Sequence, residues 1–177
     1  MIEHMPNFII TTTKPCHAQQ IHDIEVATFP DPWPQNAILQ EINDPKSICL
    51  VALQVEETAT PTPVCNNALP PHTCNKCIKE SIVLGHVTMR KIFDEGHINN
   101  IAVCPKHRRN GVGAMLMEAL LSKAQQHNIT GVTLEVRVSN TAAILLYQKY
   151  GFTIVGYRKN YYSAPQEDGA VMWNTAL

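Results

Sequence analysis

The segment from Gly96 to Leu120 constrains the fold of this 177-residue chain more than any other. It runs from an apolar stretch, "GHINNIAV", through a loop with two glycines, "HRRNGVG", into a stretch where apolar residues recur with helical period. This order predicts a β-strand, a tight loop and an amphipathic helix that buries one face against a sheet. The apolar positions expected along that helix are Met115, Leu116, Ala119 and Leu120.

Further strands and helices are predicted on both sides of this unit. Strands are expected at 8–12, 47–55, 81–92, 96–103, 132–138, 152–158 and 170–174, and helices at 16–29, at 35–42, from Val112, and from Ser139 or Asn140 to Gly151. In the helix at 16–29 the apolar positions are Ile21, Ile24, Val26 and Phe29. The order β-α-α-β-β-β-α-β-α-β-β predicts a mixed α/β sheet. We expect a single domain over 1–177, with a surface insertion at about 56–80 that is rich in Pro, Thr and Asn.

The charge balance argues against a broad electrostatic attraction to nucleic acids or membranes. The formal net charge is -1, so any anion that this chain binds must be held by local groups. We therefore expect no direct nucleic-acid partner and no membrane partner. No stretch approaches the roughly 18 apolar residues of a membrane span, and the N-terminal segment lacks the apolar run of a signal peptide. These features predict a cytoplasmic protein with reduced cysteines.

The loop between strand and helix has the composition of an anion-binding site. A helix N-terminus leaves about four backbone N–H groups unpaired and carries roughly half a positive charge. Gly111 and Gly113 are able to adopt positive φ angles, and Arg108 and Arg109 add charged donors. The spacing completes neither G-x-G-x-x-G nor a P-loop. On the loop alone, an anion cradle and a plain glycine turn with solvated arginines are equally good interpretations.

The segments around the loop resemble the Gcn5-related N-acetyltransferase (GNAT) superfamily. In that superfamily an Arg/Gln-x-x-Gly-x-Gly/Ala loop binds the pyrophosphate of acetyl-CoA through backbone amides, and Arg108, Gly111 and Gly113 match the pattern. The stretches "FPDPWPQNAILQEINDP", "HINNIAV", "LEVRVSNTAAILLYQKYGF" and "RKNYYSAPQEDGAVM" are similar to bacterial ribosomal-protein-alanine N-acetyltransferases of the RimI type. The resemblance runs from about Ile21 to Met172, apart from the insertion.

The resemblance implies a GNAT fold with about seven strands and about four helices, in which the fourth and fifth strands splay apart. It implies acetyl-CoA as cosubstrate and the N-terminal alanine of a small-subunit ribosomal protein as acceptor, joined in a ternary complex. The cofactor-binding residues that it implies are Ile101, Ala102, Val103, Arg108, Arg109, Asn110, Gly111, Val112, Gly113 and Asn140. For Asn140 a simple helix cap is an alternative role. Alternative functions are transfer to lysine or to a small-molecule amine, and a non-catalytic acyl-CoA-binding or zinc-dependent interaction module.

Two residues are candidates for acid and base catalysis. Acetyl transfer requires an unprotonated amine and a proton for the departing thiolate, and an α-amine with a pKa near 8 needs only a modest base. Glu135 lies mid-strand on a polar face, where the plain alternative is a solvated pair with Arg137. The resemblance implies that Glu135 is the general base and Tyr147 the acid. For Tyr147 the alternative is a core aromatic, although Ile144 and Leu145 already supply core positions.

Trp33, in the "DPWP" corner, and the pair Tyr161 and Tyr162 are candidates to line a peptide groove. Ordinary packing explains them equally well, because large aromatic side chains at chain corners and strand ends are commonly buried. The sequence leaves their role open.

The insertion contains the pattern "CNNALPPHTCNKC", which includes Cys65, His72, Cys74 and Cys77. A C-x-x-C pair binds zinc when a second pair of ligands is available, and here the second pair lacks standard spacing. We therefore expect a surface loop with reduced thiols and no metal, with zinc or a disulfide as alternatives.

Overall fold

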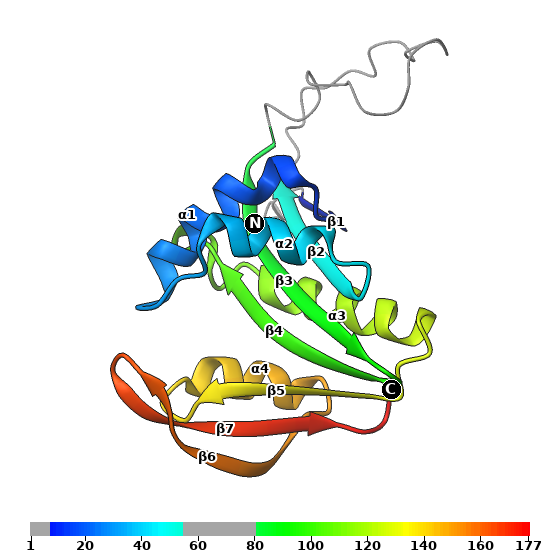
Figure 1. The fold of residues 1–177 in the computed structure, drawn as a ribbon, viewed down its shortest axis with the longest axis vertical. Helices are drawn as coiled ribbons and strands as arrows, with labels where there is room; N and C mark the ends of the chain where they lie inside the picture. The colour runs from blue at the N-terminus through cyan, green and yellow to red at the C-terminus, as the bar shows by residue number, and fades with distance from the viewer. Residues whose placement is uncertain (1–7, 55–80) are drawn as a thin grey trace, which may run out of the picture.

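A mixed seven-stranded sheet with helices on both faces forms the centre of the computed structural model, which describes residues 8–54 and 81–177 (Figure 1). The strands are β1 (Phe8–Thr12), β2 (Ser47–Gln54), β3 (Val83–Ile92), β4 (Glu95–Val103), β5 (Gly131–Arg137), β6 (Thr153–Ser163) and β7 (Gln166–Asn174). The helices are α1 (Ala18–Thr28), α2 (Gln35–Asn43), α3 (Val112–Gln126) and α4 (Thr141–Lys149), with short 3-10 turns at Pro15–His17 and Pro105–His107. The element order and the fold class predicted from the sequence are confirmed.

The strand order is β1-β2-β3-β4-β5-β7-β6, and only the β4–β5 pair is parallel. That pairing covers the positions from Glu95↔Gly131 to Ile98↔Leu134 and then ends. Beyond it, β4 continues to pair with β3, after a bulge at Asn99, and β5 continues to pair with β7. The two strands therefore diverge toward their carboxyl ends (Figure 1), which confirms the predicted splay of the fourth and fifth strands.

Two apolar clusters, one on each face of the sheet, form the core. Helices α3 and α4 cover one face, where Leu116, Met117 and Leu120 are fully buried. Helices α1 and α2 cover the other face, around Ile21 and Ile24.

The predicted inward faces of two helices need correction. Met115 in α3 and Val26 in α1 are exposed, and Met117 and Glu25 are buried in their place. The apolar periods leave the rotation of a helix uncertain by about one residue, or 100°, and contacts with the sheet decide it.

The expected mid-strand position of Glu135 is confirmed, because Val132, Leu134 and Val136 are buried on one face of β5 and Glu135 lies on the other. The predicted strand ran to Val138, but β5 ends at Arg137 and Val138 is exposed. Strands β6 and β7 extend further than predicted, to Ser163 and from Gln166. β6 is an edge strand and is exposed over most of its length, so its sequence lacks an apolar alternation.

The insertion with Cys65, His72, Cys74 and Cys77 lies outside the described residues. Within residues 8–54 and 81–177, no group of three or more His, Cys, Asp or Glu side chains is arranged to hold a metal ion. No helix in the described part of the chain is long and apolar enough to cross a membrane.

Candidate active site

The divergence of β4 from β5 leaves one edge of β4 without a strand partner from Asn99 to Val103. The side chain of Ala102 is buried toward α1 and α2, while Ile101 and Val103 pack against the cluster on the α3 face. The carbonyl of Val103 accepts a hydrogen bond from Arg108 Nε at 3.2 Å. The predicted binding segment Ile101–Val103 therefore lies at the opened edge, with its other edge fixed to β3.

The loop before α3 presents backbone N–H groups at its helix end. Gly111 is the N-cap with φ 79°, and Arg109 also has a positive φ of 68°. The first helical bond runs from Met115 N to Gly111 O, so the N–H groups of 112–114 have no partner in the helix. None of these three groups donates a hydrogen bond to another described residue. Gly113 lies within α3 and does not use a positive φ.

The two arginines of the loop differ in their surroundings. Arg108 bridges two elements, because its Nε donates to Val103 O and its guanidinium donates to Thr28 Oγ1 at 3.3 Å. Arg109 is exposed and donates no side-chain hydrogen bond within the described residues. The backbone amides at the start of α3 are therefore better placed than the Arg108 side chain to hold an anion.

Glu135 lies on β5 just beyond the last residue that pairs with β4, and its side chain is only 6% exposed. Its Oε2 is 3.2 Å from His97 Nε2, and its Oε1 is 3.1 Å from the Arg158 guanidinium. Arg137 does not pair with it: Arg137 forms an ion pair with Glu167 at 3.1 Å and covers the Tyr162 ring at 4.2 Å. The simple surface pair between Glu135 and Arg137 is therefore absent.

His97 is a residue of this site that the sequence analysis missed. It lies on β4 beside Thr133 of β5, and its side chain is partly exposed next to the Glu135 carboxylate. A signal was present, since His97 is a polar residue within an apolar strand. The unpaired Asn99 at the bulge interrupts the alternation of polar and apolar residues that would have placed His97 on the same face as Glu135.

Tyr147 is only 6% exposed, and its ring lies 6.0 Å from that of Phe152. Burial, with a smaller effect from the nearby Tyr162, raises the pKa of Tyr147 above its ordinary value. Its hydroxyl makes no hydrogen bond within the described residues, so it carries a proton that is free to be donated. Tyr147 is also part of the core, and the argument that Leu145 supplies a core position is wrong because Leu145 is exposed.

Asn140 caps the start of α4. Its Oδ1 accepts from Ala143 N at 3.2 Å, which is the capping role considered as the alternative. The preceding residue is also fixed, because Ser139 N donates to Glu167 Oε1 at 2.7 Å. The amide nitrogen of Asn140 makes no hydrogen bond within the described residues, so contact with a cofactor remains compatible with the cap.

A second carboxylate, Glu25 of α1, is fully buried between α1 and the sheet. It accepts hydrogen bonds from Trp33 N at 3.2 Å and from Asn100 Nδ2 at 2.9 Å, and His86 Nε2 lies 2.9 Å from its Oε1. Glu25 therefore connects the corner at Trp33 to β3 and β4. Trp33 itself packs against the core cluster under α1 and α2, as expected if its role is partly structural.

Comparisons with known proteins identify a family and several relatives. The sequence profile described as "Acetyltransferase (GNAT) family" matches residues 18–152. A Bacillus subtilis relative is 28% identical over 156 residues, 88% of this chain and 87% of its own length. The ribosomal protein bS18-alanine N-acetyltransferase of Salmonella typhimurium is 42% identical over 83 residues, which cover 46% of this chain and 56% of that protein.

Among solved structures, the ribosomal-protein-S18-alanine N-acetyltransferase from Escherichia coli superposes with a TM-score of 0.74 at 23% identity. The superposition covers 97% of this chain and 96% of that chain. This likeness supports the assignment of the fold.

The loop geometry predicts which of two variants loses more affinity for acetyl-CoA. Gly111→Val forces a β-branched residue into a left-handed conformation, which costs about 1–2 kcal/mol and displaces the amides at the start of α3. We expect Gly111→Val to weaken acetyl-CoA binding, measured by isothermal titration calorimetry, more than Arg109→Ala does. The opposite ranking of the two affinities would contradict the assignment of the anion site to the backbone.

The buried carboxylate of Glu25 gives a stability prediction. Glu25→Ala leaves Asn100 and His86 without their buried acceptor, so we expect the free energy of unfolding to fall by about 3 kcal/mol or more. Asp23→Ala, on the exposed side of the same helix, is the control and is expected to change it by less than about 1 kcal/mol. Urea denaturation measures the free energy of unfolding of both variants. Equal losses in the two variants would contradict a stabilising role for the hydrogen bonds of Glu25.

Proposed function

Because this chain belongs to the acetyltransferase (GNAT) family, we propose that it acetylates the N-terminal α-amine of a ribosomal protein, with alanine as the first residue. It is an acetyltransferase, and acetyl-CoA is its cosubstrate. The observation that carries the proposal is the buried Glu135 carboxylate beside His97, at the point where β4 and β5 separate. The ribosomal acceptor is supported by the names of relatives such as the Salmonella typhimurium enzyme.

In the proposed complex, acetyl-CoA lies between the opened edge of β4 and the start of α3. The N–H groups from Arg109 to Gly113 hold the pyrophosphate, with the positive end of the α3 dipole behind them. The free edge of β4 at Ile101–Val103 supplies the backbone groups that bind the pantetheine arm. The Arg108 side chain does not contact the cofactor in this arrangement. It positions the loop through its hydrogen bonds to β4 and α1.

The amine reaches the thioester from the side of Glu135 and His97. The amine nitrogen forms a bond with the thioester carbonyl carbon while its proton passes to the pair formed by Glu135 and His97. An α-amine with a pKa near 8 is partly unprotonated at neutral pH, so a carboxylate with a histidine partner is a sufficient base. Arg158 fixes the other carboxylate oxygen, which keeps Oε2 directed at His97.

The carbon–sulfur bond of the tetrahedral intermediate then breaks, and the leaving thiolate takes a proton. Tyr147 supplies this proton, because its hydroxyl is protonated and is not engaged with another described residue. The acetyl group passes directly from acetyl-CoA to the amine in a ternary complex. No nucleophilic cysteine is involved in this scheme.

In the proposed complex the corner at Trp33 and the β6–β7 hairpin border the acceptor side. The hairpin is held close to β5 because Arg137 donates to the carbonyls of Ala164 at 2.8 Å and Pro165 at 3.0 Å. Tyr162 lies beneath the same guanidinium, so its ring is fixed rather than free. A peptide N-terminus enters between these two elements in the proposed complex.

A peptide assay tests the acceptor and the base together. Incubation with acetyl-CoA and a peptide beginning with alanine, read by mass spectrometry, is expected to give acetylation at the α-amine. Glu135→Gln is expected to lower kcat by about 100-fold or more with acetyl-CoA affinity retained, while Glu118→Gln, an exposed control, has no effect. Faster acetylation of lysine side chains or of polyamines would overturn the proposed acceptor.

The pH dependence of kcat/KM tests the proposed role of Tyr147 as the acid. A raised pKa keeps the Tyr147 hydroxyl protonated to higher pH, so the acid form is lost only above pH 10. We expect kcat/KM to rise through the amine pKa near 8 and to show no fall below pH 10. Tyr147→Phe is expected to lower kcat by about 100-fold, and the exposed Tyr157→Phe to leave it unchanged. A decrease in rate between pH 8 and 9 would contradict this role for Tyr147.

A further inference from the structure

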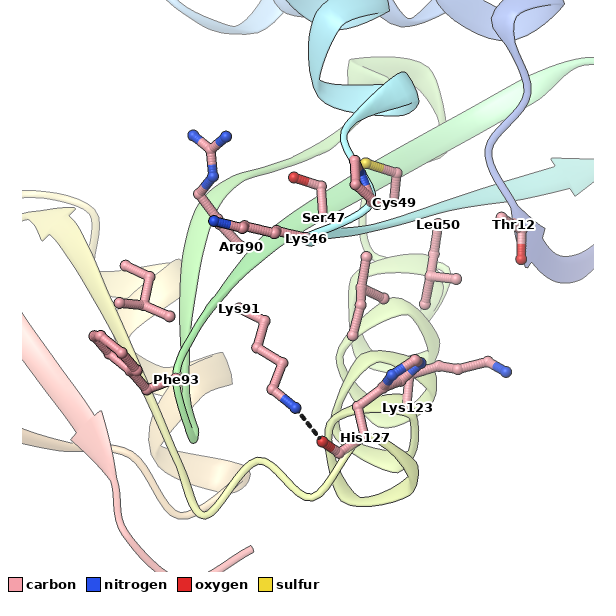
Figure 2. A pocket seen from close by; sticks show the side chains of 13 residues that line it. Thr12, Lys46, Ser47, Cys49, Leu50, Arg90, Lys91, Phe93, Lys123 and His127 are labelled. Carbon is pink, nitrogen blue, oxygen red and sulfur yellow. Dashed lines mark hydrogen bonds between the residues drawn. The ribbon is translucent and has the colours of Figure 1, made fainter.

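A pocket of about 620 Å³ lies at the opposite end of α3 from the proposed acetyl-CoA site (Figure 2). We call it the basic pocket and define it by Lys46, Arg90, Lys91, Lys123 and His127, which come from the start of β2, the end of β3 and the end of α3. At about 1.5 Å per residue of helix, Lys123 lies roughly 15 Å along α3 from Gly113. The basic pocket is therefore separate from the site of acetyl transfer.

The basic pocket carries an excess of positive charge, which Asp44, beside Arg90 and Lys46, offsets in part. Of the 14 Lys and Arg residues in the chain, 4 line the pocket. The described residues that line it include no Asp or Glu. Arg90 pairs with Asp44 outside the lining. Lys46, Lys91 and Lys123 form no ion pair within the described residues, and Lys91 instead donates to the carbonyl of His127 at 2.6 Å. Lys123 donates to Gln126 Oε1 at 3.1 Å. An ammonium group has three donors, so Lys91 and Lys123 each retain N–H groups for an anion.

Phe93 lies at the margin of the basic pocket, on the two-residue turn between β3 and β4 (Figure 2). Its φ is 58°, a value at which glycine is favoured in such turns, and its side chain is 91% exposed. An exposed aromatic ring at a position suited to glycine contributes neither packing nor backbone stability. This makes Phe93 a candidate for contact with a ligand.

The remaining lining is suited to binding and not to covalent chemistry. Ile48 and Leu50 of β2 form an apolar wall. Cys49 also lines the pocket, but burial, with smaller effects from Glu41 and Asp44, raises the pKa of its thiol to about 12. The thiol is therefore protonated at neutral pH and is not a nucleophile.

We propose that the basic pocket and Phe93 form a contact site for single-stranded RNA, with the lysines on phosphates and the Phe93 ring stacked on a base. A positively charged groove beside an exposed aromatic ring is the arrangement that binds single strands without strong sequence preference. A concave pocket does not suit a flat membrane surface. This inference does not depend on the proposed acetylation reaction, because none of its residues belongs to the catalytic site. It departs from the expectation, based on net charge, of no nucleic-acid partner.

The first test is binding of a fluorescein-labelled 12-nucleotide uridine RNA, followed by fluorescence anisotropy between 50 and 200 mM KCl. Three lysine–phosphate contacts predict a slope of about -2 for the logarithm of affinity against the logarithm of salt concentration. The double variant Lys46→Gln, Lys123→Gln is expected to lower affinity at 50 mM at least tenfold and to reduce the slope to about -0.7. Its matched control removes two exposed charges elsewhere, in Lys149→Gln, Lys159→Gln, and is expected to bind normally.

The second test separates the Phe93 ring from the stability of the fold. Phe93→Gly removes the ring and fits the backbone, so RNA affinity is expected to fall about tenfold while the thermal midpoint is unchanged or higher. Acetylation of a free alanine-starting peptide is expected to be unchanged in this variant, so the two proposals can fail independently.

Four results would overturn the proposal, and the first three concern RNA and vesicles. These are no RNA binding at 50 mM KCl, equal binding by wild type and the Lys46, Lys123 double variant, and tighter binding to phosphatidylserine vesicles than to RNA. Uridine monophosphate that binds as tightly as the 12-nucleotide strand would also overturn it, because a strand with several phosphate contacts must bind more tightly than one nucleotide.

Discussion

The end of the β4–β5 pairing after Ile98 and Leu134 is the constraint on which the rest of the site depends. Each strand is held on its other side, β4 by β3 and β5 by β7, so neither is able to follow the other. At the bulge, the side-chain amide of Asn99 donates to the buried carboxylate of Glu41. The side-chain amide of the next residue, Asn100, donates to Glu25. These bonds hold β4 toward α1 and α2. Because α3 follows β4 and α4 follows β5, the two helices begin on either side of the resulting opening.

Two buried carboxylates illustrate how the same side chain serves structure or chemistry. Glu25 is surrounded by donors within the core and has no solvent access, so its bonds stabilise one arrangement of α1, β3 and β4. Glu135 has equally strong partners, but His97 and Arg158 are themselves partly exposed. A proton and a substrate are able to reach Glu135 through them. Access of the partners to solvent, and not burial of the carboxylate, distinguishes the catalytic candidate from the structural one.

The sequence predicted the order of the elements because each has a clear local period. The alternation around Glu135 and the helical repeat after Val112 were sufficient to place β5 and α3. Glu25 and His97 were not predicted, since their partners are distant in sequence and only the folded sheet brings them together. Which face of a helix is buried was uncertain for the same reason. The resemblance to a family made Glu135 and Tyr147 candidates for catalysis, whereas residue patterns alone left a structural role open for both.

Net charge does not determine local binding, because screening confines the influence of exposed charges to about 8–10 Å in physiological salt. A chain with a net charge of -1 therefore accommodates a cationic pocket at one end of a helix. Part of that charge has a structural explanation, since Lys123 in the last turn of α3 complements the negative end of the helix dipole. Lys91 contacts the same end of the helix, because its ammonium donates to the carbonyl of His127, the C-cap of α3. Lys46, which precedes β2, makes no such contact. Lys46 and the exposed Phe93, which also line the pocket, are not explained by stabilisation of the helix.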